Sequence, residues 1–280
     1  MKEDFYTFGG SYFWEDVFFY QKWRIQRNHT SKKFRLLDNW DIRRFEGSFE
    51  ECRKAFVKYI NAFEITRQKG HMVIMIHSLG QGKNFFKPLW REVLKHNFLA
   101  AALNYPSTQK NVAGHVRQFH FFMNHLEDVE EVSFVTYGTG NLILQKLFAE
   151  NAEWQTKLKI RRAVLVNPCV YGNRLISSLC KNKFFSFLIG PMGMDLAPKN
   201  SKKYPPLNKV ETGVVLFRES FIMRVFKFLF RSSSAKKSPS EIKDDIGAKD
   251  ISVVRNLKFD VFKNEQISSN VVKFLQHGKF

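Results

Sequence analysis

The sequence predicts an α/β domain built on a mostly parallel sheet with helices on its faces. Four short apolar runs alternate with segments whose apolar residues recur at helical spacing, which is the pattern of repeated strand–helix–strand units. A glycine turn joins one of these runs directly to a helix at Val132–Gly140. At 280 residues the chain can bury one sizeable core, so one domain with excursions fits better than two domains.

The first 68 residues come before this pattern and are expected to form an aromatic and basic lead-in with one helix packed on the core. Alternating apolar and basic residues at Trp23–Leu37 predict a hairpin or a pair of edge strands. Ser48 and Glu51 have the spacing of a capping box, which predicts a helix from there to Phe63.

Residues 69–280 carry the alternating pattern of the sheet. Strands and helices are predicted in the order His71–Ile76, Phe85–Lys95, Phe98–Leu103, Val112–Leu126, Val132–Thr136, Asn141–Glu150 and Arg162–Val166. A helical cap is then expected over about residues 171–240, with a candidate strand inside it at Gly213–Phe217. The last strand and the last helix are predicted at Leu257–Phe262 and Ser268–Gln276.

The glycine turn has the layout of a nucleophile elbow that lacks its nucleophile. In the Gly-x-Ser-x-Gly elbow, a strand, a tight turn and a helix lift a serine hydroxyl above the sheet. The apex residue here is Gly138, which has no side chain. In hydrolases with such an elbow the histidine follows the serine and the acid along the chain, and His277 is the only histidine after Gly138. Losing the nucleophile or the base costs on the order of 10⁴–10⁶ in turnover.

Several segments, taken in order, resemble the α/β-hydrolase-fold lipases and esterases, particularly a bacterial lipase-like group. They are His77–Gly80, Leu103–Ser107, Thr136–Asn141, Asn167-Pro168, Phe187–Gly193 and Phe274–Phe280. The resemblance covers nearly the whole chain. It implies the α/β-hydrolase fold with a helical cap or lid, and ester hydrolysis as the reaction class of an active member.

The resemblance also implies a degenerate catalytic triad. Gly138 takes the nucleophile position, and Asp245 (or Asp244) matches the acid position. Lys258 is the nearest match to the histidine position. The backbone amides of Leu79 and Thr139 correspond to the oxyanion donors of an active relative.

Three other side chains are alternative nucleophiles for an active ester hydrolase. Ser78 has His77 beside it, although neighbouring residues of an extended segment point to opposite faces. The hydroxyl of Thr139 is better suited to capping the following helix. Cys169 follows the fourth strand, where a plain buried cysteine is the simpler interpretation.

The positive net charge of the chain favours anionic partners. Lys and Arg number 45 against 26 Asp and Glu, a net charge of +19. No recognisable nucleic-acid-binding module is present, so nucleic acid is not the expected partner. The basic amphipathic segment Phe221–Arg231 predicts either a lid over the old pocket or a contact with an anionic membrane surface.

No metal or cofactor is predicted. His115, His120 and His125 share one predicted helix, but their spacing turns successive side chains away from a common metal. The three cysteines are an odd number without metal spacing, which favours a reducing compartment. The N-terminal segment is a poor signal peptide and no run of about 20 apolar residues occurs, so a cytoplasmic location with peripheral membrane contact is expected.

The sequence therefore predicts a lipase- or esterase-like protein that has lost hydrolysis. It would act by binding a lipid or acyl ligand, a membrane surface or a protein partner. Two alternatives stay open: an active ester hydrolase with a non-standard nucleophile, and a basic interaction or nucleic-acid-binding protein. The sequence leaves the oligomeric state open.

Overall fold

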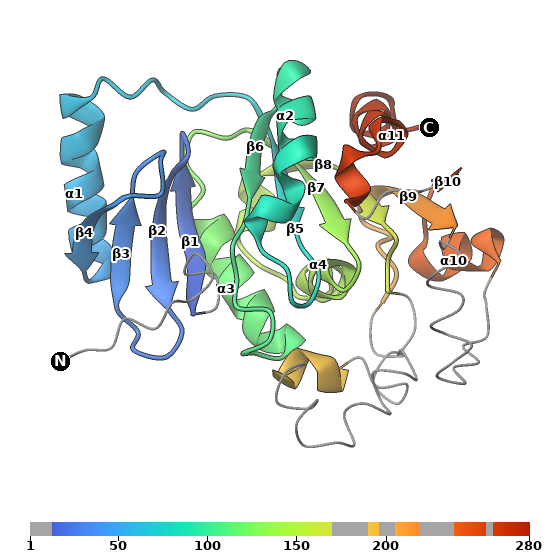
Figure 1. Cartoon of the computed structure of the whole chain (residues 1–280), viewed down its shortest axis with the longest axis horizontal. Coiled ribbons are helices and arrows are strands. Elements are labelled where there is room, and N and C mark those ends of the chain that lie inside the picture. The colour runs from blue at the N-terminus through green and yellow to red at the C-terminus, as the bar shows by residue number, and fades with distance from the viewer. Residues whose placement is uncertain (1–12, 170–189, 196–204, 219–237, 256–259) are drawn as a thin grey trace.

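A six-stranded parallel sheet forms the centre of the molecule, with strand order β10-β9-β8-β7-β5-β6 (Figure 1). The computed structural model describes residues 13–169, 190–195, 205–218, 238–255 and 260–280. The strands are β5 (His71–Ile76), β6 (Leu99–Ala102), β7 (Glu131–Tyr137), β8 (Lys159–Val166), β9 (Glu211–Arg218) and β10 (Asp250–Arg255). The apolar runs of β5, β6, β7 and β8 are mostly buried on both faces, as expected for a parallel sheet, whereas the edge strand β10 keeps Val253 half-exposed.

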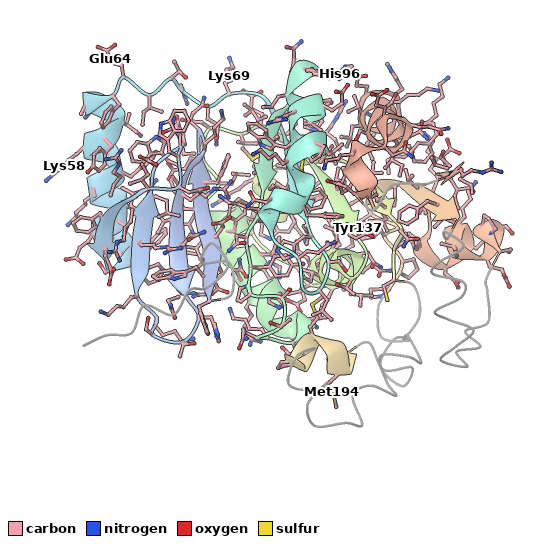
Figure 2. The ribbon with its side chains drawn as sticks, viewed as in Figure 1. Lys58, Glu64, Lys69, His96, Tyr137 and Met194 are labelled. Carbon is pink, nitrogen blue, oxygen red and sulfur yellow. The ribbon has the colours of Figure 1, made fainter. Side chains whose placement is uncertain are left out.

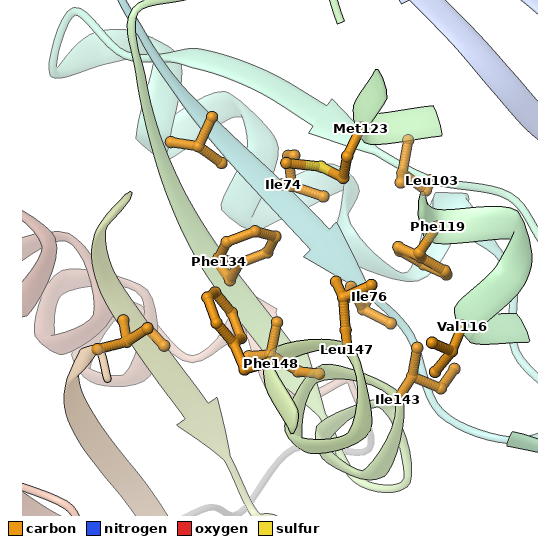
Figure 3. Close-up of a cluster of buried hydrophobic side chains, with 14 of the residues drawn as sticks. Ile74, Ile76, Leu103, Val116, Phe119, Met123, Phe134, Ile143, Leu147 and Phe148 are labelled. Carbon is orange, nitrogen blue, oxygen red and sulfur yellow. The ribbon is translucent and has the colours of Figure 1, made fainter. Parts of the chain in front are cut away.

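Helices cover both faces of this sheet. They are η2 (Lys83–Phe86), α2 (Lys87–Lys95), α3 (Val112–Asn124), α4 (Gly140–Ala149), α5 (Trp154–Lys157), α10 (Pro239–Ile246), η3 (Val261–Lys263) and α11 (Glu265–His277). Because side chains alternate along a strand, Ile74 and Phe134 face α3 and α4 (Figure 3), while Val73 and Val135 lie in a second cluster with α2 and α11. Gly213 leaves room for α11, since a Cβ there would lie 2.6 Å from the Phe274 ring.

A four-stranded antiparallel sheet precedes the parallel one. Its strands are β1 (Trp14–Tyr20), β2 (Trp23–Asn28), β3 (Phe34–Leu37) and β4 (Arg43–Gly47), and α1 (Phe49–Ala62) covers one face. The hairpin predicted at Trp23–Leu37 is confirmed as β2 and β3. The capping box of Ser48 and Glu51 is also present at the start of α1.

Buried charges join the two sheets. Asp16 on β1 is fully buried, accepts a hydrogen bond from the Asn104 amide at 2.7 Å and pairs with Arg24 at 2.6 Å. Its neighbour Glu15 is equally buried and pairs with Arg27 at 2.6 Å and with Lys110. Buried carboxylates are costly unless they are paired and hydrogen-bonded, so these partners fix how β1 lies against the loop after β6.

The sequence prediction of the last strand needs correction. The last strand is Asp250–Arg255 rather than Leu257–Phe262, where η3 forms at Val261–Lys263. The strand predicted at Gly213–Phe217, inside the expected cap range of 171–240, is confirmed as part of β9, which pairs with β8 and β10. Helix α10, with its own capping box, begins at the end of that range.

The basic segment Phe221–Arg231 lies outside the described residues. None of the helices in the described part of the chain combines the length and the apolar character needed to cross a membrane.

Candidate functional site

The predicted strand–turn–helix is present at the carboxyl end of β7. Gly138 follows the strand with a φ of +52°, in the left-handed region that favours glycine, and α4 begins at Gly140. A Cβ on Gly140 would lie 2.5 Å from the Ile76 carbonyl oxygen, so that position also requires glycine. The two glycines allow a turn sharp enough to bring the start of α4 against the end of β5.

A reciprocal pair of hydroxyls closes this turn. Ser78, in the loop after β5, accepts a hydrogen bond from the Thr139 amide through its Oγ at 3.1 Å. Thr139 Oγ1 accepts one from the Leu79 amide at 2.8 Å. The two hydroxyl oxygens are 3.2 Å apart and hydrogen-bond to each other. We call Ser78 and Thr139 the hydroxyl lock.

The hydroxyl lock uses both backbone amides that the resemblance assigns as oxyanion donors. An oxyanion hole stabilises a reaction intermediate through N–H groups aimed at the substrate oxygen. Here the amides of Leu79 and Thr139 are already hydrogen-bonded to side chains of the chain itself. In this conformation neither amide is free to hold a substrate oxygen.

His77 does not serve Ser78 as a base. Its ring is fully buried and stacks on Tyr105, with ring centroids 3.9 Å apart. Nδ1 lies 2.9 Å from the Ser78 carbonyl oxygen, and Nε2 has no hydrogen-bond partner among the described residues. Burial lowers the pKa of His77 to about 4. The expectation that His77 is badly placed for the Ser78 hydroxyl is therefore confirmed.

Cys169 lies directly beside the turn. Its amide donates to the Gly138 carbonyl at 3.2 Å and to Asn141 Oδ1 at 3.0 Å. Burial raises the pKa of its thiol to about 11, so the thiolate that would act as a nucleophile is scarce at neutral pH. Cys169 is half-buried, so the predicted full burial is not what the structure shows.

Comparison with known proteins identifies the fold. No protein-family model and no curated protein matches the sequence. A monoacylglycerol lipase from Paleococcus ferrophilus superposes with a TM-score of 0.51 at 12% identity, over 74% of this chain and 94% of that one. An esterase from Exiguobacterium antarcticum gives 0.49 at 9% identity, over 74% and 92%. This chain has the α/β-hydrolase fold. The predicted fold class is thereby confirmed.

The acid implied by the resemblance is not at the elbow of this α/β-hydrolase fold. Asp244 and Asp245 lie on the exposed side of α10, which ends at Gly247, shortly before β10. The Lys249 amide donates to the Thr212 carbonyl at the start of β9, so this end of α10 lies at the amino edge of the sheet. Since the elbow lies at the carboxyl edge, neither aspartate can take the acid position. Lys258, the match to the histidine position, lies outside the described residues.

Aromatic side chains that the sequence did not single out gather beside the elbow. Tyr137, the last residue of β7 (Figure 2), lies 4.6 Å from Phe85 and 6.1 Å from Phe262 between ring centroids. Phe217 of β9 stacks on Tyr137 at 6.5 Å. Phe85, Tyr137 and Phe217 are only half-buried, so part of each ring stays exposed. We call these three residues the aromatic wall. Tyr137 and Phe217 lie at the carboxyl ends of β7 and β9, and Phe85 lies in η2, within the segment after β5. Their place after predicted strands is the sequence signal that could have found them.

Two polar residues of α4 hold the ends of the segment that leaves the sheet after β8. Asn141 Nδ2 donates to the Cys169 carbonyl at 3.3 Å and to Gln145 Oε1 at 3.0 Å. Gln145 Nε2 donates to the Pro205 carbonyl at 3.1 Å. Both side chains are buried. They therefore fix residues 169 and 205 against the helix that starts at the elbow.

Proposed function

We propose that this α/β-hydrolase-fold protein has lost ester hydrolysis and acts by binding a lipid or acyl ligand beside the elbow. The observation that carries the proposal is the hydroxyl lock. A hydrolase that lacks its nucleophile or base keeps a residual rate of roughly 10³–10⁴ over water, from the oxyanion hole and substrate binding. The hydroxyl lock occupies the two amides of the oxyanion hole that would support this residual rate.

The aromatic wall supports an apolar ligand. Sites for small molecules are mostly lined by apolar and aromatic side chains with a few polar groups for orientation. Phe85, Tyr137 and Phe217 present half-exposed rings next to the lock, where an acyl chain could lie. The net charge of +19 favours ligands with an anionic head group.

Hydrolysis is tested first, with a panel of short- and medium-chain acyl esters. We expect no turnover above the background of a heat-inactivated sample. If the wild-type protein hydrolyses these esters, Ser78→Ala, Thr139→Val and Cys169→Ala identify the nucleophile, because only its loss abolishes turnover. That result would establish the active-hydrolase alternative and remove the proposed loss of function.

Binding is tested with dodecanoate displacing a fluorescent fatty acid. Tyr137→Ser should weaken binding by about tenfold, because the ligand loses an aromatic contact. The matched control is Tyr59→Ser, which changes another half-buried tyrosine, on helix α1 against the antiparallel sheet. Equal affinity in both variants, or no binding by the wild type, would contradict the proposed ligand site.

A further inference from the structure

The turn that joins β3 to β4 exposes two large apolar side chains. Trp40 is 76% exposed and Ile42 is 52% exposed, only two residues apart. Single exposed apolar residues are common on protein surfaces, but an exposed tryptophan with an apolar neighbour marks an interaction site more often. We call residues 38–42 the Trp40 turn.

The Trp40 turn is held rigidly, so the exposure is built into the fold. Asp38 is 2% exposed, and its Oδ1 accepts hydrogen bonds from the amides of Trp40 and Ile42, each at 2.9 Å. Its other carboxylate oxygen pairs with Arg44 at 2.6 Å. These bonds fix the backbone of the turn in the conformation that exposes Trp40 and Ile42.

Ion pairs connect the Trp40 turn to the loop that carries half of the hydroxyl lock. Asp41 pairs with Lys83 at 2.5 Å and lies 3.8 Å from Arg24. Lys83 begins η2, in the loop that leaves the carboxyl end of β5 and also contains Ser78. The Trp40 turn is therefore attached to the edge of the parallel sheet on which the elbow lies.

Exposed cations lie along the hairpin formed by β3 and β4, with Arg43 directly after Ile42 and Lys33 at the other end of β3. Arg43 and Lys33 have side chains 60% and 57% exposed, and both share the single carboxylate of Glu46, at 2.9 and 3.6 Å. Residues 32–46 contain five Lys or Arg against three Asp or Glu, which leaves a local excess of positive charge. Tryptophan and aliphatic side chains flanked by Lys and Arg suit the headgroup region of an anionic bilayer.

We propose that the Trp40 turn docks this protein on anionic lipid bilayers, with Trp40 and Ile42 entering the headgroup region and Arg43 facing the lipid phosphates. A projecting turn fits a flat lipid surface, and the positive excess matches its negative charge. This docking rests on the proposed function, because its purpose would be to bring the ligand site close to a membrane. Docking through this turn would place the elbow edge near a source of acyl ligand.

Vesicle flotation tests the docking. The full chain is mixed with vesicles of phosphatidylcholine alone, or of phosphatidylcholine and phosphatidylglycerol in equal amounts. We expect binding to the anionic vesicles only, weakened by added salt because the exposed charges are screened. Trp40→Ser with Ile42→Ser should lower the partition coefficient by about tenfold or more, since the inserted apolar area is lost.

The control variant is Val253→Ser on β10, at the far end of the molecule from β3 and β4 (Figure 1). Val253 is 50% exposed, close to the exposure of Ile42, so its change removes a similar apolar area without touching the turn. Val253→Ser should bind the vesicles as the wild type does. A loss of binding equal to that of the double variant would overturn the assignment to the Trp40 turn.

Trp40 also reports its own insertion. Brominated lipid should quench the fluorescence of the wild type and not that of Trp40→Phe, which can still dock. Unchanged quenching in Trp40→Phe, or no binding to anionic vesicles at all, would overturn the docking proposal. Dodecanoate binding measured without vesicles separates the two proposals: if the protein binds dodecanoate but not vesicles, only the docking inference fails. If it binds vesicles but not dodecanoate, only the proposed ligand site fails.

Discussion

Ser78 Oγ lies 2.5 Å from the position that a Cβ on Gly138 would occupy. The Cβ of Ser78 is 3.0 Å from the same position. The side chain of Ser78 therefore takes the space into which a nucleophile at the elbow apex would project. The hydroxyl lock can form in this position because Gly138 has no side chain.

This relationship predicts that restoring the catalytic side chains alone will not restore catalysis. Gly138→Ser with Lys258→His should stay inactive on acyl esters, because the new Cβ would meet Ser78 at a distance that real side chains do not adopt. Adding Ser78→Gly removes the obstruction and frees the Thr139 amide. The triple variant should therefore gain slow ester hydrolysis from the serine–histidine pair, although it lacks the acid and Thr139 Oγ1 still binds the Leu79 amide. The measurement is turnover of the acyl panel. Turnover by the double variant equal to that of the triple variant would show that Ser78 does not block the apex.

The hydroxyl lock should also stabilise the loop after β5. Thr139→Val removes the acceptor of the part-buried Leu79 amide and should lower the free energy of unfolding by about 1 kcal/mol, the typical net contribution of a hydrogen bond. Thr139→Ser keeps the hydroxyl and serves as the control. Urea denaturation measures the loss, and hydrogen exchange at the Leu79 amide localises it. If Thr139→Val leaves that amide as protected as in the wild type, the lock is not a stabilising contact.

The elbow could be predicted from sequence because its signals are local. A β-branched run, two glycines and an amphipathic helix follow one another within Val132–Ala149, and each makes its own element. The hydroxyl lock could not be predicted, because it joins residues 61 positions apart through side-chain hydrogen bonds. Two common residue types carry it, and neither has a distinctive pattern around it.

Strand β1 shows why part of the fold was missed. Its run Trp14–Tyr20 contains Glu15 and Asp16, which interrupt the apolar pattern of a buried strand. Both carboxylates are buried only because distant cations, among them Arg24 and Lys110, meet them in the folded chain. The last strand was misplaced for a related reason: among the described strands, β10 pairs only with β9, and it keeps Val253 exposed.

The buried charges that join the two sheets should be important for stability. Asp16→Ala removes the close carboxylate partner of the buried Arg24, leaving Asp41 at 3.8 Å, and should cost about 3–5 kcal/mol, the typical effect of breaking a buried pair. Glu153→Ala, which breaks the exposed pair with Lys157, is the control and should barely change the unfolding midpoint. Chemical denaturation followed by circular dichroism compares the two. Equal effects would mean that the Asp16 pair is no more important than a surface pair.

Two buried histidines should make the fold sensitive to acid. Burial lowers the pKa of His115 from 6.5 to about 3 and that of His77 from 6.5 to about 4. Between pH 6.5 and the folded-state pKa of each histidine, the unfolded chain binds a proton that the folded chain excludes. The neutral histidines therefore contribute their full stability above pH 6.5, and this contribution is lost as the pH falls. Each of them should lower the free energy of unfolding by about 1.4 kcal/mol per pH unit within its window.

The test is the slope of the unfolding free energy against pH between 6.5 and 4.5, measured by urea denaturation. His115→Phe keeps a ring beside Tyr105, whose centroid lies 4.9 Å away, and should remove the contribution of one proton from that slope. His277→Gln changes an exposed histidine at the end of α11 and should leave the slope as it is. If His115→Phe leaves the slope of the wild type unchanged, the acid sensitivity comes from carboxylates instead. Those groups lose their stabilising pairs on protonation, at lower pH, so extending the series below pH 4.5 separates the two origins.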